Sequence, residues 1–288
     1  MEAVAPLIVI TGPTASGKTG LALSLAERHG GEIVCADSRT VYAGLDVGTA
    51  KPTVEERARV PHHLLDVARP DERFTVHDFQ TRALHAIADI RNRGKVPFLV
   101  GGTGLYVDSV VLGYEFTEDN LPERVKLSQF SIEQLHQMIK EQQLPFPENN
   151  MNKRHLVHAL LHPRTETRHR NIPDENTYVV AIATDKIDLF HRISTRAQDM
   201  FTADIVGETK RAAKIFGWDC GALTGNIYPI VRQMIEGQVS REEAVEQFIL
   251  RDRQLVKRQL TWLKRHDYIH WKTLTEAESF IDALLASY

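Results

Sequence analysis

Residues 12–19 of this 288-residue chain form a glycine-rich segment that can bind phosphate. The segment directly follows the apolar run 7–10 and consists of Gly12, Pro13, Thr14, Ala15, Ser16, Gly17, Lys18 and Thr19. Its glycines permit a turn with inward-pointing backbone N–H groups, and the helix expected after it directs a positive end at an anion. Lys18 adds charge, and the Thr19 hydroxyl can complete a Mg²⁺ shell. Kinases, NTPases and transferases of other groups all use such loops, so the loop alone leaves the reaction open.

Two more polar segments follow apolar runs. Asp37 comes after the run 33–36, and its carboxylate could support Mg²⁺ or accept a proton from a nucleophile. A structural alternative is that Asp37 caps a turn through Ser38. Thr103 lies in the glycine segment 101–104 after the run 96–100, where glycines allow a ligand to approach the backbone closely.

The elements that must position these side chains follow an alternating pattern. Apolar runs at 7–10, 32–36, 63–67 and 96–100 predict strands, and residues 17–29 and 77–93 predict helices between them. This alternation predicts an α/β fold of the P-loop NTPase-like type, a parallel sheet wrapped by helices. Its functional loops should lie at the carboxyl ends of the strands.

The second half of the chain changes character. Residues 115–150 are polar and marked by prolines, with one short amphipathic helix near 132–140, and they predict a small, mostly helical insert. The core then comprises 1–114 and 151–288. Within it, 177–184 predicts a returning strand, and the rest of the C-terminal part is mostly helical.

Composition narrows the class of protein. A formal net charge of −3 argues against coating nucleic acid through bulk charge, although local basic faces remain possible. No stretch is long enough to cross a bilayer, and the first residues lack the pattern of a signal peptide. Two cysteines, Cys35 and Cys220, provide no disulfide framework. We expect a cytoplasmic monomer without membrane contact.

Five further motifs accompany the glycine-rich segment in a fixed order. They are Ala36-Asp37-Ser38-Arg39 with Val41-Tyr42, Asp46-Val47-Gly48-Thr49-Ala50-Lys51-Pro52, Val60-Pro61-His62-His63-Leu64-Leu65-Asp66, Val100-Gly101-Gly102-Thr103-Gly104-Leu105-Tyr106, and Lys257-Arg258-Gln259-Leu260-Thr261-Trp262. With these motifs the chain closely resembles the bacterial tRNA dimethylallyltransferases, also called tRNA isopentenyltransferases.

The resemblance implies transfer of a dimethylallyl group from dimethylallyl diphosphate to N6 of the adenine next to the tRNA anticodon. The loop 12–19, Lys18 and a Mg²⁺ held partly by Thr19 would then stabilise the leaving diphosphate. The family assigns the proton-accepting role to the aspartate that matches Asp37. Thr103 would form a hydrogen bond near the reacting centre.

The same resemblance implies contacts with the anticodon stem-loop. The target base must leave its stack, and contacts with the RNA backbone must offset that cost. The implied RNA-binding residues are Asp37, Ser38, Arg39, Thr40, Thr103, Arg154, His155, His158, Arg253, Lys257 and Arg258. A solvated charged helix face is the alternative for the basic residues near 251–265.

Departures from the family pattern fall on the RNA side. Thr40 stands where glutamine is usual, and His155 and His158 stand where arginines are usual. Histidines are mostly neutral at pH 7, so these phosphate contacts are weakened. The element Ile227-Tyr228-Pro229 and the residue Thr224 also differ from the family pattern. A small-molecule kinase, a non-catalytic tRNA-binding relative and an enzyme acting on free adenine nucleotides remain as alternatives.

Overall fold

The computed structural model describes residues 4–116, 121–162, 169–225 and 227–288. The chain divides into two compact units, Met1–Leu112 with Ile172–Tyr288, and Gly113–Asn171. The first unit contains the phosphate-binding segment and the predicted sheet.

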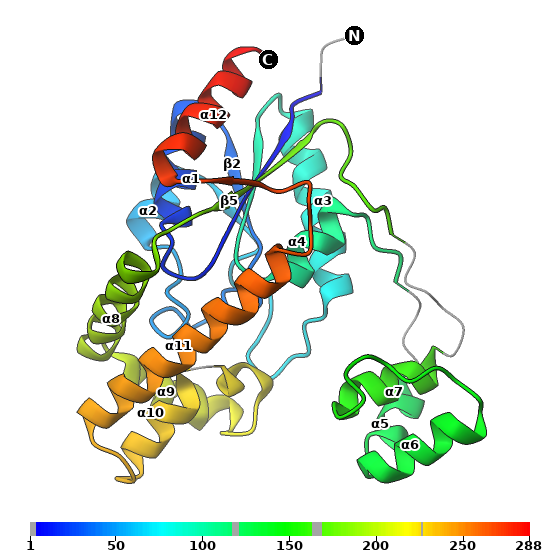
Figure 1. The fold of residues 1–288 in the computed structure, drawn as a ribbon. Coiled ribbons are helices and arrows are strands. Elements are labelled where there is room, and N and C mark those ends of the chain that lie inside the picture. The colour runs from blue at the N-terminus through cyan, green and yellow to red at the C-terminus, as the bar shows by residue number, and fades with distance from the viewer. Residues whose placement is uncertain (1–3, 117–120, 163–168, 226) are drawn as a thin grey trace. The chain divides into compact units, whose positions relative to one another are not determined.

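The described residues form a six-stranded parallel sheet in the order β3-β2-β4-β1-β5-β6 (Figure 1). The strands are β1 (Leu7–Thr11), β2 (Glu32–Cys35), β3 (His62–His63), β4 (Pro97–Val100), β5 (Thr177–Ile182) and β6 (His270–Lys272). In register, Ile10 of β1 and Cys35 of β2 both pair with Val100 of β4. The carboxyl ends of β1, β2 and β4 are therefore neighbours, which confirms the predicted α/β fold and groups the three loops that follow these strands.

Helices cover both faces of the sheet (Figure 1). On one face lie α1 (Lys18–Arg28) and α12 (Leu274–Ala286), where Leu25 and Ile281 pack in one core cluster with alternate strand residues such as Ile8. On the other face lie α3 (Val76–Asn92) and α4 (Gly104–Val111). Phe79 of α3 stacks on Tyr106 of α4 with ring centroids 4.1 Å apart, so α4, which follows the Thr103 loop, is held against α3.

A helical layer extends beyond the carboxyl edge of the sheet. It comprises α8 (Lys186–Thr202), α9 (Ile205–Phe216), the short 3-10 turn Gly221–Thr224, α10 (Tyr228–Ile235) and α11 (Arg241–Leu263). Side chains from these helices enclose Val41 and Leu45 of the loop after β2, in one cluster with Phe248 and Tyr228. The long helix α11 extends beyond the other helices of this layer and ends beside α4 (Figure 1). Its last turns therefore reach the carboxyl edge of the sheet.

The predicted strand 63–67 is wrong except at its first residue. Only His62 and His63 pair with β2, because Leu64 and Asp66 adopt left-handed backbone angles, with φ of 64° and 56°. The turn is fixed by the buried Lys51 ammonium, which donates to Asp66 Oδ1 at 2.6 Å. The helix α2 (Val54–Arg59) precedes this turn.

The second unit is a small helical cluster of α5 (Leu121–Leu127), α6 (Ile132–Glu141) and α7 (Lys153–Leu161). Leu156 and Val157 of α7 pack against Leu135 and Ile139 of α6. This packing groups α7 with the insert, so the compact unit is longer than the predicted range 115–150. Residues 117–120 of that range lie outside the described residues.

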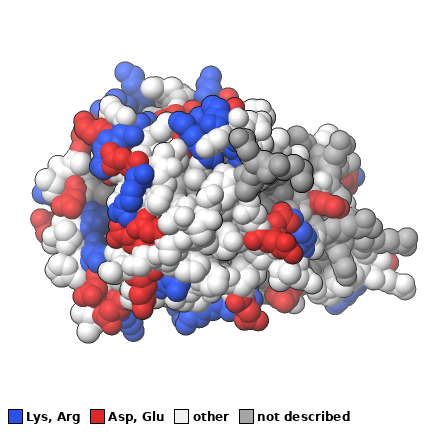
Figure 2. All heavy atoms as spheres, turned by 90° about the horizontal axis from the view of Figure 1, so that it is seen from above, with Lys and Arg blue, Asp and Glu red and all other residues white. Residues whose placement is uncertain are grey.

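Charges are mixed on the face of the molecule that Figure 2 shows. Lys and Arg side chains alternate with Asp and Glu over the described part of this face, and no patch of a single sign gathers there. Separately, none of the helices within the described ranges combines the length and the apolar character needed to cross a membrane.

Candidate active site

The segment between β1 and α1 adopts a backbone conformation that requires glycine at two positions. Gly12 has φ 139° and Gly17 has φ 92°, both in the region that L side chains avoid. A Cβ on Gly12 would also lie 3.1 Å from the backbone nitrogen of Ile182. Gly17 is the N-cap of α1, so the positive end of this helix opens onto the loop. A glycine turn that opens onto a helix N-terminus is suited to hold an anion.

Lys18 is a half-buried cation within this loop. Its Nζ donates to the carbonyl oxygen of Pro13 at 2.7 Å. Burial lowers the pKa of the ammonium to about 8, which the nearby Asp37 carboxylate partly opposes and the Arg196 guanidinium assists. An anion bound in the loop would favour the charged form and restore the higher pKa.

Two arginines of α8 also reach the loop, and sequence reasoning missed both. Arg192 Nη1 donates to the Ser16 carbonyl oxygen at 3.5 Å, and Arg196 Nη1 donates to the Thr14 hydroxyl. They lie four residues apart on one helix face. The four-residue spacing of the two arginines was the available signal in the sequence. Because α8 is far from the loop along the chain, that spacing could not show that the arginines contact the loop.

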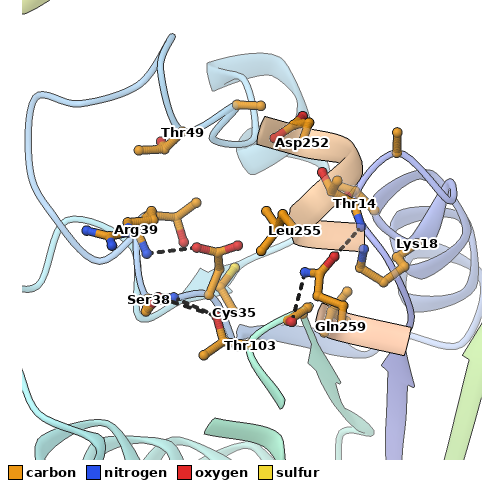
Figure 3. Close-up of a pocket in the computed structure, with 18 of the residues that line it drawn as sticks. Thr14, Lys18, Cys35, Ser38, Arg39, Thr49, Thr103, Asp252, Leu255 and Gln259 are labelled. Carbon is orange, nitrogen blue, oxygen red and sulfur yellow. Dashed lines mark hydrogen bonds between the residues drawn. The ribbon is translucent and has the colours of Figure 1, made fainter. Parts of the chain in front are cut away.

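The loops after β2 and β4 meet through side chain and backbone contacts (Figure 3). The Ser38 amide donates to Thr103 Oγ1 at 3.1 Å, and the Arg39 amide donates to Asp37 Oδ1 at 2.7 Å. Asp37 and Thr103, predicted separately from sequence, are thus parts of one junction. The Asp37 carboxylate keeps a fixed orientation because its Oδ1 is bound by the backbone.

A buried glutamate shapes the adjacent wall of the site. Glu208 of α9 accepts three backbone amides, those of Asp46 at 2.6 Å, Val47 at 2.7 Å and Gly48 at 2.9 Å. The Tyr228 hydroxyl donates to the same carboxylate at 3.0 Å. A Cβ on Gly48 would lie 2.5 Å from the Tyr228 ring, so the loop 46–50 and Tyr228 require each other. Neither Glu208 nor this role of Tyr228 was predicted.

These groups surround one cavity of about 750 Å³ in the first unit. Predicted residues that line it are Thr14, Ala15, Gly17, Lys18, Thr19, Asp37, Ser38, Arg39, Thr40, Thr103 and Arg258. The remaining residues of the predicted segment 12–19 are buried. They are Gly12, Pro13 and Ser16. Thr40 presents a buried hydroxyl without a hydrogen-bond partner among the described residues.

The predicted basic residues fall in two separate places. Arg253 and Lys257 are exposed on α11, and the Arg253 guanidinium lies over the Phe190 ring, 4.6 Å from its centroid. Arg154, His155 and His158 are exposed on α7 of the second unit. Of these basic residues, only those on α11 belong to the same compact unit as the cavity.

The donor set is suited to a metal that arrives with a diphosphate. Within the described ranges, no group of three or more His, Cys, Asp and Glu side chains could hold a metal ion by itself. The cavity instead offers the Thr19 hydroxyl and the Asp37 carboxylate as oxygen donors. Mg²⁺ commonly binds through one or two such oxygens together with substrate phosphates and water, so these residues fit it.

Comparison with known proteins identifies the family. The family model for IPP transferase matches residues 40–266, and that for isopentenyl transferase matches 5–73. The tRNA dimethylallyltransferase of Bacillus licheniformis is 36% identical over 94% of this chain and 91% of that protein, and the one of Anoxybacillus flavithermus is 34% identical over 95% and 92%.

Solved structures agree. The tRNA isopentenylpyrophosphate transferase of Bacillus halodurans superposes with a TM-score of 0.74 at 31% identity, over 98% of this chain and 97% of that chain. A eukaryotic dimethylallyltransferase, 22% identical with a TM-score of 0.77 over 93% of this chain and 74% of that chain, shares the fold. From its glycine-rich loop, the order of its motifs and these matches over nearly its whole length, the chain belongs to the IPP transferase family.

Proposed function

We propose that this protein transfers a dimethylallyl group from dimethylallyl diphosphate to N6 of the adenine adjacent to the anticodon in tRNA, releasing diphosphate. One observation supports this beyond family membership. A single cavity joins an anion cradle, built by residues 12–19, to a carboxylate and a hydroxyl, those of Asp37 and Thr103. Alkylation with a diphosphate leaving group requires that the anion cradle and these two side chains reach the two substrates at the same time.

The cradle supports the departure of diphosphate. As the allylic C–O bond breaks, negative charge grows on the diphosphate, and preorganised donors lower the barrier when they face that charge. Lys18 supplies a cation inside the loop, and Arg192 and Arg196 flank it. When bound to Thr19 and the diphosphate, Mg²⁺ would supply further charge neutralisation.

The loop after β2 supports the other half of the reaction. The N6 lone pair of adenine is delocalised into its ring, so attack is favoured when a base takes the N6 proton. In our proposal the N6–C bond forms, the C–O bond to diphosphate breaks, and the proton passes to the Asp37 carboxylate. The amide of Arg39 fixes Oδ1 of that carboxylate, which orients its second oxygen independently of the substrate. Thr103 holds the backbone of this loop through Ser38.

An RNA acceptor is supported by α11. Its residues Arg253, Lys257 and Arg258 are exposed, and Arg258 lines the cavity. Cations on this helix can bind backbone phosphates and offset the cost of extracting a base from its stack, about a few kcal/mol.

The decisive experiment supplies purified protein with Mg²⁺, dimethylallyl diphosphate and an anticodon stem-loop that carries adenine beside the anticodon. We expect mass spectrometry to show one added dimethylallyl group on that adenine, and no addition when guanine replaces it. AMP in place of the stem-loop tests a free-nucleotide acceptor, and γ-labelled ATP tests a kinase. Labelling in either of these arms without RNA alkylation would refute the proposal.

A further inference from the structure

The side chain of Gln259 bridges the two loops that carry the proposed chemistry (Figure 3). Its Oε1 accepts the backbone amide of Thr14 at 2.8 Å, and its Nε2 donates to the carbonyl oxygen of Gly102 at 2.9 Å. One amide group of α11 therefore ties the phosphate loop to the loop that contains Thr103.

The fit around this amide is close. A Cβ on Gly102 would lie 2.5 Å from Gln259 Nε2 and 3.3 Å from the carbonyl oxygen of Gly12. The three chain segments leave no room for a side chain here, so the Gln259 bridge requires glycine at position 102. A change in the position of α11 must move or break this bridge.

The bridge lies in the same helical turn as the proposed RNA contacts. Lys257 and Arg258 directly precede Gln259, and both are exposed. One turn later, Trp262 Nε1 donates to the buried Asp108 carboxylate at 2.7 Å, which anchors this end of α11 to α4. Phosphate contacts at Lys257 and Arg258 would immobilise a turn whose inner side already holds both loops.

We propose that Gln259 is a positioning residue that couples RNA binding on α11 to diphosphate binding in the loop 12–19. RNA contacts at Lys257 and Arg258 fix Gln259, which orders the loop before diphosphate arrives and reduces the entropy lost on binding. By reciprocity, diphosphate then tightens RNA binding by the same factor. The inference rests on the proposed function, because it takes a tRNA stem-loop as the ligand of α11.

The test measures the affinity of inorganic diphosphate with Mg²⁺ by calorimetry, without RNA and with saturating stem-loop. For the wild-type protein we expect the stem-loop to tighten diphosphate binding at least about fivefold. Gln259→Met, which keeps the length of the side chain and removes both hydrogen bonds, should reduce this ratio to within about twofold of one. Its RNA affinity without diphosphate should stay within about twofold of wild type.

Two further variants isolate the cause. Gln259→Glu keeps an acceptor for the Thr14 amide and loses the donor to Gly102, so we expect an intermediate affinity ratio. The added negative charge acts on diphosphate binding both with and without the stem-loop, so its effect cancels in the ratio of the two affinities. This variant also carries the test if Gln259→Met does not fold. Gln254→Met, an exposed glutamine on the same helix, should keep the wild-type ratio. A purely structural role for Gln259 would lower stability without changing the ratio.

The proposal is overturned if the stem-loop changes the diphosphate affinity of the wild-type protein by less than about twofold. It is also overturned if Gln259→Met shows the same affinity ratio as the wild-type protein. No turnover is required for these measurements. A protein that shows the coupling but alkylates no RNA would therefore refute the proposed function alone, and an active protein without coupling would refute the positioning role alone.

Discussion

The hydroxyl of Thr103 accepts the backbone amide of Ser38, 3.1 Å away, and so joins the loops after β4 and β2. Thr103→Val keeps the shape of the side chain and removes this acceptor. We expect unfolding free energy to fall by about 1 kcal/mol, and kcat to fall because the neighbouring Asp37 loses its fixed backbone. Steady-state kinetics and urea unfolding check both effects. Thr103→Ser should restore most of the rate, and a Val variant with wild-type kcat would contradict this role.

Asp37→Asn tests the proton acceptor. The Asn side chain can still accept the Arg39 amide, so the loop should keep its conformation. Loss of the base should lower kcat by about 10²- to 10⁴-fold, measured in single-turnover experiments with saturating RNA. Diphosphate affinity should change little, because the cradle is intact. Weaker diphosphate binding with normal turnover would assign Asp37 to the metal or diphosphate instead.

Lys18 gives the site a specific pH dependence. Its pKa is lowered to about 8 by burial, so the free protein loses this charge as pH rises through that value. Loss of the Lys18 charge should weaken diphosphate affinity as pH rises above about 8, as titration calorimetry can show. Lys18→Met should bind diphosphate weakly at every pH and flatten this profile.

The same shift has the opposite sign for stability. Between the folded pKa near 8 and the usual lysine value of 10.5, the unfolded chain binds more protons than the folded one. Lys18 therefore contributes a rise of the unfolding free energy with pH across this window. The stabilising contribution is complete above the unfolded pKa and is lost as pH falls through the folded pKa. Urea unfolding of wild type and Lys18→Met at successive pH values should show this contribution as a difference between the two proteins that grows from pH 8 to pH 10.5.

The predictable part of the site lies where the chain leaves parallel strands. Residues 12–19, Asp37 and Thr103 follow β1, β2 and β4, and a parallel sheet brings such loops to one edge. Gln259 and Arg196 come from helices far along the chain, and helical periodicity does not reveal which turn of a helix meets which loop. The prediction of a strand at 63–67 was wrong for a local reason, because left-handed backbone angles at Leu64 and Asp66 end the strand early.

Arg196→Gln tests the flank of the cradle that sequence did not reveal. Arg196 donates to the Thr14 hydroxyl and lies close enough to Lys18 to lower its pKa. Hydrogen bonds to charged groups contribute about 1.5–3 kcal/mol, so we expect diphosphate affinity to fall about tenfold or more. The control is Arg211→Gln, an exposed arginine of α9 that pairs with Asp204. Equal effects of both variants would mean that only general charge matters.

The attachment of α11 to α4 can be tested at Asp108, whose buried carboxylate accepts Trp262 Nε1 at 2.7 Å and contacts His266 Nε2 at 3.0 Å. Asp108→Ala leaves the indole N–H without its acceptor, which should lower unfolding free energy by about 1–3 kcal/mol in urea. Burial raises the pKa of this carboxyl, so its charge is costly. Asp108→Asn, which keeps an acceptor without charge, should be more stable than Asp108→Ala. The exposed Asp267→Ala should match wild type, and equal losses at 108 and 267 would exclude this anchor.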